Sequence, residues 1–195
     1  MKPDPSSKAA EIIACARSLL ATGGYNGFSY ADISASVHIT KASIHHHFPT
    51  KADLVQTVVG LYREEARAGL AALAAQVPDP LAQLNAYISY WDACLRDGTA
   101  SFCVCAMLGA EMPALPEPVA AEVQGHFRDL SAWLASVLAR GSAQGIFTVR
   151  ANAEADAMAL MAQVHGGMLS ARVYGDPAIF GAIVQRAVAQ LTQQN

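Results

Sequence analysis

Apolar side chains recur along this chain mainly at the three- and four-residue spacing of an α-helix. In the first segment Ile12, Ala16 and Leu19 fall on one helical face, and alternating runs typical of β-strands are scarce throughout. Gly and Pro residues interrupt the pattern and mark the ends of its segments. The sequence therefore predicts an all-α protein of about nine helices. They are expected over residues 7–22, 30–37, 41–47, 51–76, 80–97, 102–112, 118–143, 153–174 and 178–192.

The last two predicted helices each carry a stripe of apolar and small side chains at helical spacing. Such a stripe needs a partner surface. Pairing both helices with the same helices of a second copy gives a twofold, four-helix interface, so we expect a homodimer. The side chains predicted to form the interface are Met158, Met161, His165, Leu169, Ile183, Val184, Ala187 and Val188.

Two short predicted helices, over residues 30–37 and 41–47, and the start of the helix over residues 51–76 follow one another closely. Ser29 is followed three residues later by Asp32, and Thr50 by Asp53, which is the pattern of a hydroxyl cap with a returning acid. Only residues 37–40 link the first two of these helices, so one helix must cover the other across a tight turn. The segment predicts a helix-turn-helix.

The second helix of this motif has the properties of a DNA-recognition helix. Thr40 would cap it and leave its free N–H groups and positive dipole end facing outward, which favours a phosphate. A helix of about two turns fits the major groove of B-DNA. Of the three histidines that follow, we expect His47 to face the helix packing. The side chains predicted to contact DNA are Ser29, Thr40, Lys41, Ser43, His45, His46 and Lys51.

Charge alone does not identify a nucleic-acid-binding protein here. The 195 residues carry a net charge of -3, and residues 1–53 amount to only +1 against -4 for the remainder. With 53% hydrophobic and 15% charged residues, the composition predicts a compact fold with buried oligomer contacts. Local placement of a few hydrogen-bond donors must therefore account for DNA binding.

Several other classes of protein are disfavoured. The polar start of the chain does not resemble a signal peptide, and the apolar run over residues 102–110 is too short to span a membrane. We find no phosphate-binding loop, nucleophile motif or metal-ligand pair at helical spacing, so we expect neither an enzyme nor a cofactor. The adjacent His45, His46 and His47 diverge around a helix and cannot converge on one metal ion. The four cysteines lack the dense spacing of a disulfide scaffold, which favours free thiols in a reducing cytoplasm.

The stretch from Phe28 to Ile33, together with that from Ile39 to Leu54, resembles the N-terminal signature of the TetR/AcrR family of transcriptional regulators. The resemblance covers about residues 8–60. It implies a helix-turn-helix DNA-binding domain over residues 1–53 and a helical effector-binding and dimerisation domain over residues 54–195.

Two positions depart from the family pattern. His38 stands in the turn where the family usually has Gly, and we expect it to adopt a left-handed conformation at some strain. His45 replaces a usual Tyr in the recognition helix, which shortens the reach to a phosphate. The operator of a relative therefore cannot be assumed for this chain.

Aromatic and polarizable side chains in the second domain have two interpretations. Each one alone is most simply part of the core, but together they could line a pocket for a small apolar or aromatic effector. The candidate pocket residues are Tyr87, Trp91, Cys103, Met107, Phe127, Trp133, His165 and Tyr174.

The cysteines also leave two interpretations open. Cys103 and Cys105 point to different helical faces and would be small buried hydrophobes, or Cys103 would be a reactive thiol near a helix start. The stretch from Phe102 to Glu111 is similar to a region in family members that sense reactive electrophiles.

These observations predict a ligand-responsive regulator, most simply a repressor. As a homodimer it would bind a palindromic operator, and a small effector would release it by shifting the helix over residues 51–76. The alternative is a helical small-molecule carrier or adaptor that has no operator.

Overall fold

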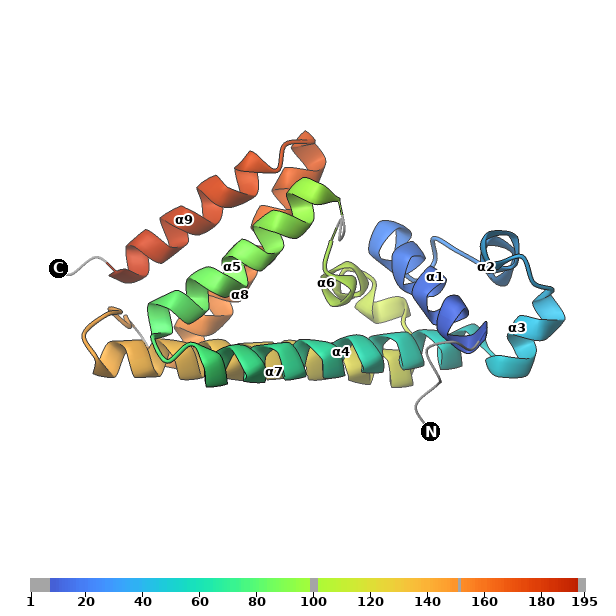
Figure 1. Cartoon of the computed structure of the whole chain (residues 1–195), viewed down its shortest axis with the longest axis horizontal. Helices are drawn as coiled ribbons and strands as arrows, with labels where there is room; N and C mark the ends of the chain where they lie inside the picture. Colours follow the sequence, from blue (N-terminus) through green and yellow to red (C-terminus); the bar gives the residue numbers. More distant parts are fainter. Residues whose placement is uncertain (1–7, 99–101, 151, 193–195) are drawn as a thin grey trace. The chain divides into compact units, whose positions relative to one another are not determined.

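The chain forms nine α-helices and one short 3-10 helix within residues 8–98, 102–150 and 152–192, which this computed structural model describes (Figure 1). No strand occurs in those ranges, and none of the helices there combines the length and apolar character that crossing a bilayer requires. The elements are α1 (Lys8–Gly23), α2 (Tyr30–Val37), α3 (Lys41–His47), α4 (Lys51–Gln76), α5 (Pro80–Asp97), α6 (Val104–Gly109), η1 (Met112–Ala114), α7 (Glu117–Ala143), α8 (Ala153–Tyr174) and α9 (Ala178–Thr192). The predicted all-α fold is confirmed.

The segment predicted as one helix over residues 102–112 is shorter and broken in the structure. Its α-helical part ends at Gly109, and a 3-10 turn begins at Met112. Proline lacks a backbone N–H, and its ring disfavours α-helical geometry in the residue before it. Pro113 therefore prevents α6 from continuing, and Ala110 and Glu111 lie in a turn.

The chain folds into two compact units, each built from two separate stretches of sequence. The first comprises residues 1–65 and 102–126, and the second comprises residues 66–101 and 127–195. The long helices α4 and α7 each contribute to both units. The predicted functional boundary after residue 53 does not follow these units and stays a prediction.

The core of the first unit gathers around α1. Ile12, Ala16 and Leu20 lie about one helical turn apart on α1 and are fully buried, as are Ile33 of α2 and Ile44 of α3. α1 packs against α2 and also against α6, which is distant from it in sequence. The helix-turn-helix therefore shares a core with a segment that begins about eighty residues after α1 ends.

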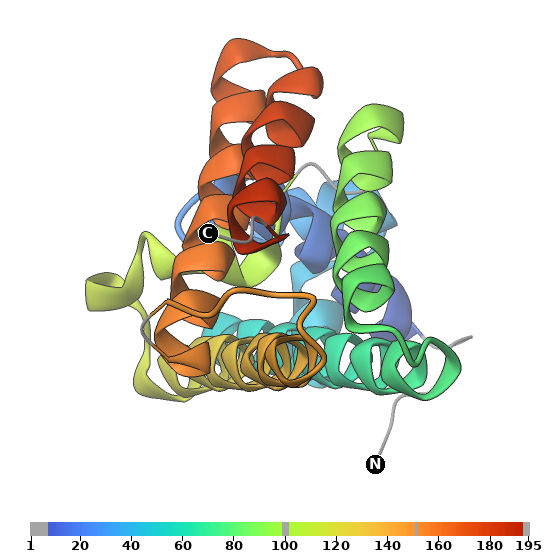
Figure 2. The ribbon, with the colours of Figure 1, turned by 90° about the vertical axis from the view of Figure 1, so that its left-hand side faces the viewer.

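The second unit is organised by the packing of α8 against α9, which lie side by side and run in opposite directions (Figures 1 and 2). Val164 and Met168 of α8 are fully buried, and so is Phe180 of α9. Gly167 allows the two helices to approach, because a Cβ at this position would lie 3.2 Å from the Phe180 ring. The face of α8 that carries Val164 and Met168 thus packs against α9 within one protomer, whereas Met158 and Leu169 of the predicted α8 stripe are exposed.

Candidate DNA-binding interface

The first helix of the motif, α2, begins with the predicted capping box. Ser29 Oγ accepts a hydrogen bond from the backbone N–H of Ala31, and the Asp32 carboxylate accepts from the Ser29 backbone N–H (2.7 Å) and hydroxyl (2.8 Å). These bonds from Ser29 lower the pKa of Asp32. The same arrangement recurs at the start of α4, where Thr50 and Asp53 bond each other reciprocally. Both caps predicted from the sequence are confirmed.

The turn between α2 and α3 depends on a left-handed residue. His38 has φ +56° and ψ +45°, as predicted, and its N–H donates to the Ser34 carbonyl. The backbone N–H of Ile39 donates to the same carbonyl, and the Ser34 hydroxyl donates to the Ile39 carbonyl at 2.5 Å. Ser34 therefore fixes both sides of the turn, a role that the sequence analysis did not assign.

The front of α3 is open to solvent. Thr40 caps the helix by accepting a hydrogen bond from the Ser43 N–H at 3.1 Å, and both Thr40 and Lys41 are exposed. Ser43 is half-buried, while Ile44 is fully buried against the rest of the unit. The dipole end of α3 and the Lys41 ammonium can therefore meet a ligand without any rearrangement of this unit.

The three histidines at the end of α3 have different surroundings. The His45 ring packs edge-on against Tyr30, with 4.7 Å between ring centroids, and its Nδ1 lies 3.0 Å from the Pro49 carbonyl oxygen. Because a carbonyl oxygen can only accept, Nδ1 carries the N–H of this contact. His46 and His47 are both exposed. The expectation that His47 faces the helix packing is therefore wrong, because Ile44 and Phe48 already fill that side.

Lys51 is held inside the first unit. Its ammonium donates to the Phe28 carbonyl and lies 4.8 Å from the ring centroid of Tyr25 and 4.2 Å from that of Phe28. Partial burial lowers the pKa of Lys51. The lysine therefore ties the start of α4 to the loop before α2, and its predicted phosphate contact would have to use another of the three ammonium N–H groups.

Tyr30 is a structural residue that the sequence analysis missed. Its hydroxyl donates to the Phe48 carbonyl at 2.8 Å and so joins the start of α2 to the end of α3. Burial is the largest of the causes that raise the pKa of Tyr30 to about 12. An aromatic residue directly after the capping serine was the available signal, although the sequence does not show where its hydroxyl would reach.

Comparison with known proteins identifies both halves of this arrangement. The family model "Bacterial regulatory proteins, tetR family" matches residues 12–58, and "Tetracyclin repressor-like, C-terminal domain" matches residues 80–187. A TetR-family transcriptional regulator from Agrobacterium tumefaciens is 55% identical, with a TM-score of 0.94 over 97% of this chain and 100% of that one. The chain belongs to the TetR family of transcriptional regulators.

More distant structures show the same fold. A TetR transcriptional regulator from Legionella pneumophila is 24% identical, with a TM-score of 0.85 over 98% of this chain and 100% of that one. The regulatory protein TetR from Rhodobacter sphaeroides is 23% identical, with a TM-score of 0.84 over 93% of this chain and 97% of that one. None of the curated proteins matches the chain. The TetR family consists of helix-turn-helix DNA-binding regulators and not of enzymes.

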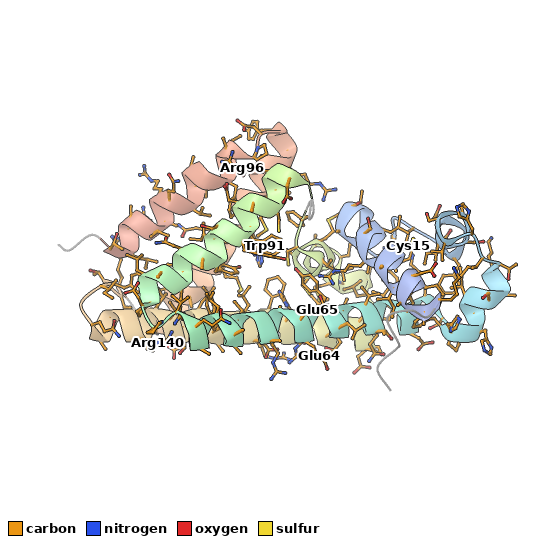
Figure 3. The ribbon with its side chains drawn as sticks, in the orientation of Figure 1. Cys15, Glu64, Glu65, Trp91, Arg96 and Arg140 are labelled. Carbon is orange, nitrogen blue, oxygen red and sulfur yellow. The ribbon has the colours of Figure 1, made fainter. Side chains whose placement is uncertain are left out.

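Six of the predicted effector residues of this TetR-family regulator lie in the second unit, and five of these six are buried or half-buried there. Tyr87 and Trp133 have ring centroids 5.6 Å apart, and Phe127 and His165 have centroids 5.2 Å apart. Trp91 is 7% exposed and projects from α5 to the inside of the unit (Figure 3). Burial lowers the pKa of His165 to about 4, so the ring is neutral at physiological pH.

The other three predicted effector residues do not join this group. Tyr174 is 74% exposed at the end of α8, so the prediction that it lines an interior pocket is wrong. Cys103 and Met107 belong to the first unit. The sequence could not separate these residues from the rest, because helical spacing does not show which neighbours cover a face.

Cys103 lies in a buried cluster within the first unit. It is 1% exposed, the Tyr62 hydroxyl donates to its Sγ at 3.4 Å, and His126 Nε2 lies 4.0 Å away. Burial raises the pKa of the Cys103 thiol, although the contact with Tyr62 acts in the opposite direction. The thiol is therefore protonated at neutral pH, which agrees with the interpretation as a small buried hydrophobe. The described residues contain no group of three or more potential metal ligands.

The predicted dimer residues divide into an outer and an inner set. Met158 and Leu169 of α8 are 54% and 53% exposed, whereas Met161, His165, Ile183 and Val188 are half-buried. Val184 and Ala187 are 0% and 3% exposed within the protomer. Their predicted role in the interface is wrong, because the packing of α9 on α8 already covers them.

Proposed function

We propose that this TetR-family protein is a ligand-responsive repressor that binds a palindromic operator as a homodimer in the cytoplasm. The observation that carries the proposal is the open front of α3, where Thr40 caps the helix and Lys41 is exposed. A capped but uncovered helix start attracts a phosphate oxygen, and its leading side chains then reach base edges. Lys41 would hold the backbone, while Ser43 and His46 would face the groove.

Dimerisation would use the outer face of α8. Met158, Leu169 and Val173 are more than half exposed and lie on one face of the helix together with the exposed small residues Ala162 and Gly166. An apolar stripe of this kind is costly to leave in water, and the small residues let a second helix approach closely. A twofold axis through this stripe pairs two recognition helices, which is why the operator is expected to be a palindrome.

The effector would bind among the aromatic side chains of the second unit. Tyr87, Trp91 and Trp133 offer apolar walls, and His165 offers a neutral ring nitrogen. Trp133 Nε1 is buried and makes no hydrogen bond to the described residues. A buried donor of this kind favours an uncharged aromatic or apolar molecule that carries a hydrogen-bond acceptor. Its binding would loosen operator binding by about 5- to 150-fold, the usual range of allosteric coupling.

Selection of bound fragments from random duplex DNA tests the proposal. The wild-type chain should select a palindrome. Lys41→Ala should weaken binding about tenfold on every sequence. It should also reduce the steepness of log affinity against log salt concentration by about one, because one phosphate contact is lost. Arg128→Ala, which removes an exposed cation on α7, is the matched control and should change neither. The absence of salt-sensitive duplex binding, with and without candidate ligands, would overturn the proposal.

Mass spectrometry of the intact protein under non-denaturing conditions identifies a co-purified effector. The expected ligand is small, uncharged and aromatic or apolar. Trp133→Phe keeps the aromatic wall and removes the buried N–H, so it should weaken a ligand that accepts this hydrogen bond about tenfold. A ligand bound equally well by both proteins would argue against this position as the polar contact.

A second sensing mechanism remains for direct test, because Cys103 contacts Tyr62 and lies near His126. An electrophile that alkylated Cys103 would displace these neighbours. Cys103→Ser should then abolish release of DNA by electrophiles while leaving DNA affinity unchanged. Release that persists in this variant excludes Cys103 as the sensor.

A further inference from the structure

The turn between α1 and α2 is bonded to a carboxylate from a distant part of the chain. Glu111 lies in the turn between α6 and η1, and its Oε2 accepts a hydrogen bond from the Tyr25 backbone N–H at 2.5 Å. Its Oε1 lies 3.3 Å from the backbone nitrogen of Asn26 and 3.2 Å from the Asn26 side-chain nitrogen, and accepts from both. A residue of the C-terminal family region therefore contacts the loop that leads into the helix-turn-helix.

The turn is shaped around this carboxylate. Gly24 has φ +72°, which favours glycine, and a Cβ added there would lie 2.3 Å from Glu111 Oε2. Two successive N–H groups beside a left-handed residue form a small concavity that binds anions. Gly24 is thus required twice, once for its backbone conformation and once for the close approach of the acid.

From this turn, a series of contacts leads to the recognition helix. The ring of Tyr25 lies beside the Lys51 ammonium, which is bonded to the Phe28 carbonyl. Two residues after Phe28, Tyr30 bonds the end of α3 through the Phe48 carbonyl and packs against His45. These contacts connect the α1–α2 turn to the start of α2 and to the end of α3.

We propose that Glu111 is a positioning residue of the DNA-binding unit: its carboxylate fixes the α1–α2 turn, and through it the orientation of α3 needed for sequence-specific binding. The inference rests on the operator binding proposed above. It also means that the functional DNA-binding unit extends beyond the contiguous N-terminal segment and includes the turn after α6.

Hydrogen exchange in the full-length protein tests the contact directly. Glu111→Gln removes one of two acceptor oxygens and places an amide N–H₂ against a backbone donor. The Tyr25 and Asn26 amides should then exchange about tenfold faster, because a charge-assisted bond is lost. Glu64→Gln is the matched control: Glu64 is an exposed acid of α4 in the same unit, and it points to a different side of the helix from Glu65 (Figure 3). Equal exchange in wild type and Glu111→Gln overturns the proposal.

DNA affinity supplies a readout that distinguishes positioning from electrostatics. Glu111→Gln and its control Glu64→Gln each remove one negative charge, and this loss by itself favours binding to DNA. Glu111→Gln should nevertheless weaken operator binding about fivefold, whereas its affinity for random duplex should not fall, because only sequence-specific contacts need the exact orientation of α3. If the operator is bound as tightly as by wild type, the inference fails. If the wild type selects no operator, the proposed function fails, and hydrogen exchange still decides the role of Glu111.

A milder change covers the case in which Glu111→Gln does not fold. Asn26→Ala removes one exposed side-chain donor to Glu111 and should weaken operator binding about twofold. Where Glu111→Gln does fold, its effect and that of Asn26→Ala should not add in the double variant, because both act on one contact. Full additivity of the two effects, or no effect of Asn26→Ala on exchange at Tyr25, contradicts the proposal.

Discussion

At the scale of single residues, the turn of the helix-turn-helix shows how a local departure from the family pattern is accommodated. His38 is the one non-glycine residue with positive φ among the described residues. A side chain in this conformation costs about 1 kcal/mol, and histidine tolerates it better than a β-branched residue does. The hydrogen bonds around Ser34 hold the turn in place in spite of that cost.

The stability of His38 variants should follow backbone preference. We expect His38→Val to lower the free energy of unfolding by about 1–2 kcal/mol, because a β-branched side chain is strained at positive φ. His38→Gly should raise it or leave it within about 1 kcal/mol. Urea denaturation at one protein concentration measures both. A valine variant as stable as the glycine variant would show that the turn carries no strain.

His165 should make the protein sensitive to acid. Its pKa is about 4 in the folded state, against 6.5 for an unperturbed histidine. Between these values the unfolded chain binds a proton that the folded chain does not, so stability is full above about pH 6.5 and falls as the pH decreases. From about pH 7.5 to pH 5, His165→Leu should lose about 2 kcal/mol less of its unfolding free energy than wild type. Equal losses in both proteins would contradict the burial of a neutral ring.

At the scale of elements, the local signals for helix ends account for most of the secondary structure. Ser29, Thr40 and Thr50 were all predicted to cap helices, and the hydrogen bonds confirm each one. Such caps are found because donor and acceptor lie within four residues of each other. The one break that was missed, before Pro113, also had a local signal.

The cap of α3 should influence both stability and DNA binding. Thr40→Val removes Oγ1 and leaves the Ser43 N–H without its acceptor, which should cost about 1 kcal/mol of unfolding free energy. Operator affinity should fall with it, because the start of this short helix frays. Ser36→Ala, an exposed hydroxyl of α2, is the control. Unchanged stability and affinity in Thr40→Val would mean that the cap does not hold the recognition helix.

At the scale of the whole molecule, the proposed homodimer can be tested at the exposed apolar face of α8. Leu169 is 53% exposed on the apolar face of α8. Leu169→Asp should weaken dimerisation at least about tenfold, because it places an unpaired charge in an apolar interface. Gln163→Asp adds the same charge on another exposed side of α8 and should leave the dimer intact. Sedimentation equilibrium distinguishes these outcomes. If both variants are dimers, the interface does not include this face of α8.

By itself the sequence determined the helices, their caps, the left-handed turn at His38 and the helix-turn-helix with its exposed Lys41. These features depend on residues within about one or two helical turns of each other, so a linear pattern contains them. Helical periodicity also identified the apolar stripes of α8 and α9.

Only the tertiary structure decided which surface covers which. It buried Val184 and Ala187 inside the protomer, exposed Tyr174 and turned Lys51 toward Phe28. It also brought Glu111 to Tyr25, 86 residues away. An apolar helical face shows that some surface must cover it, but the sequence does not show which surface that is. In the same way, the sequence does not show which distant N–H group donates to a given carboxylate. Such contacts are chosen by the packing of whole helices, which no local pattern of residues records.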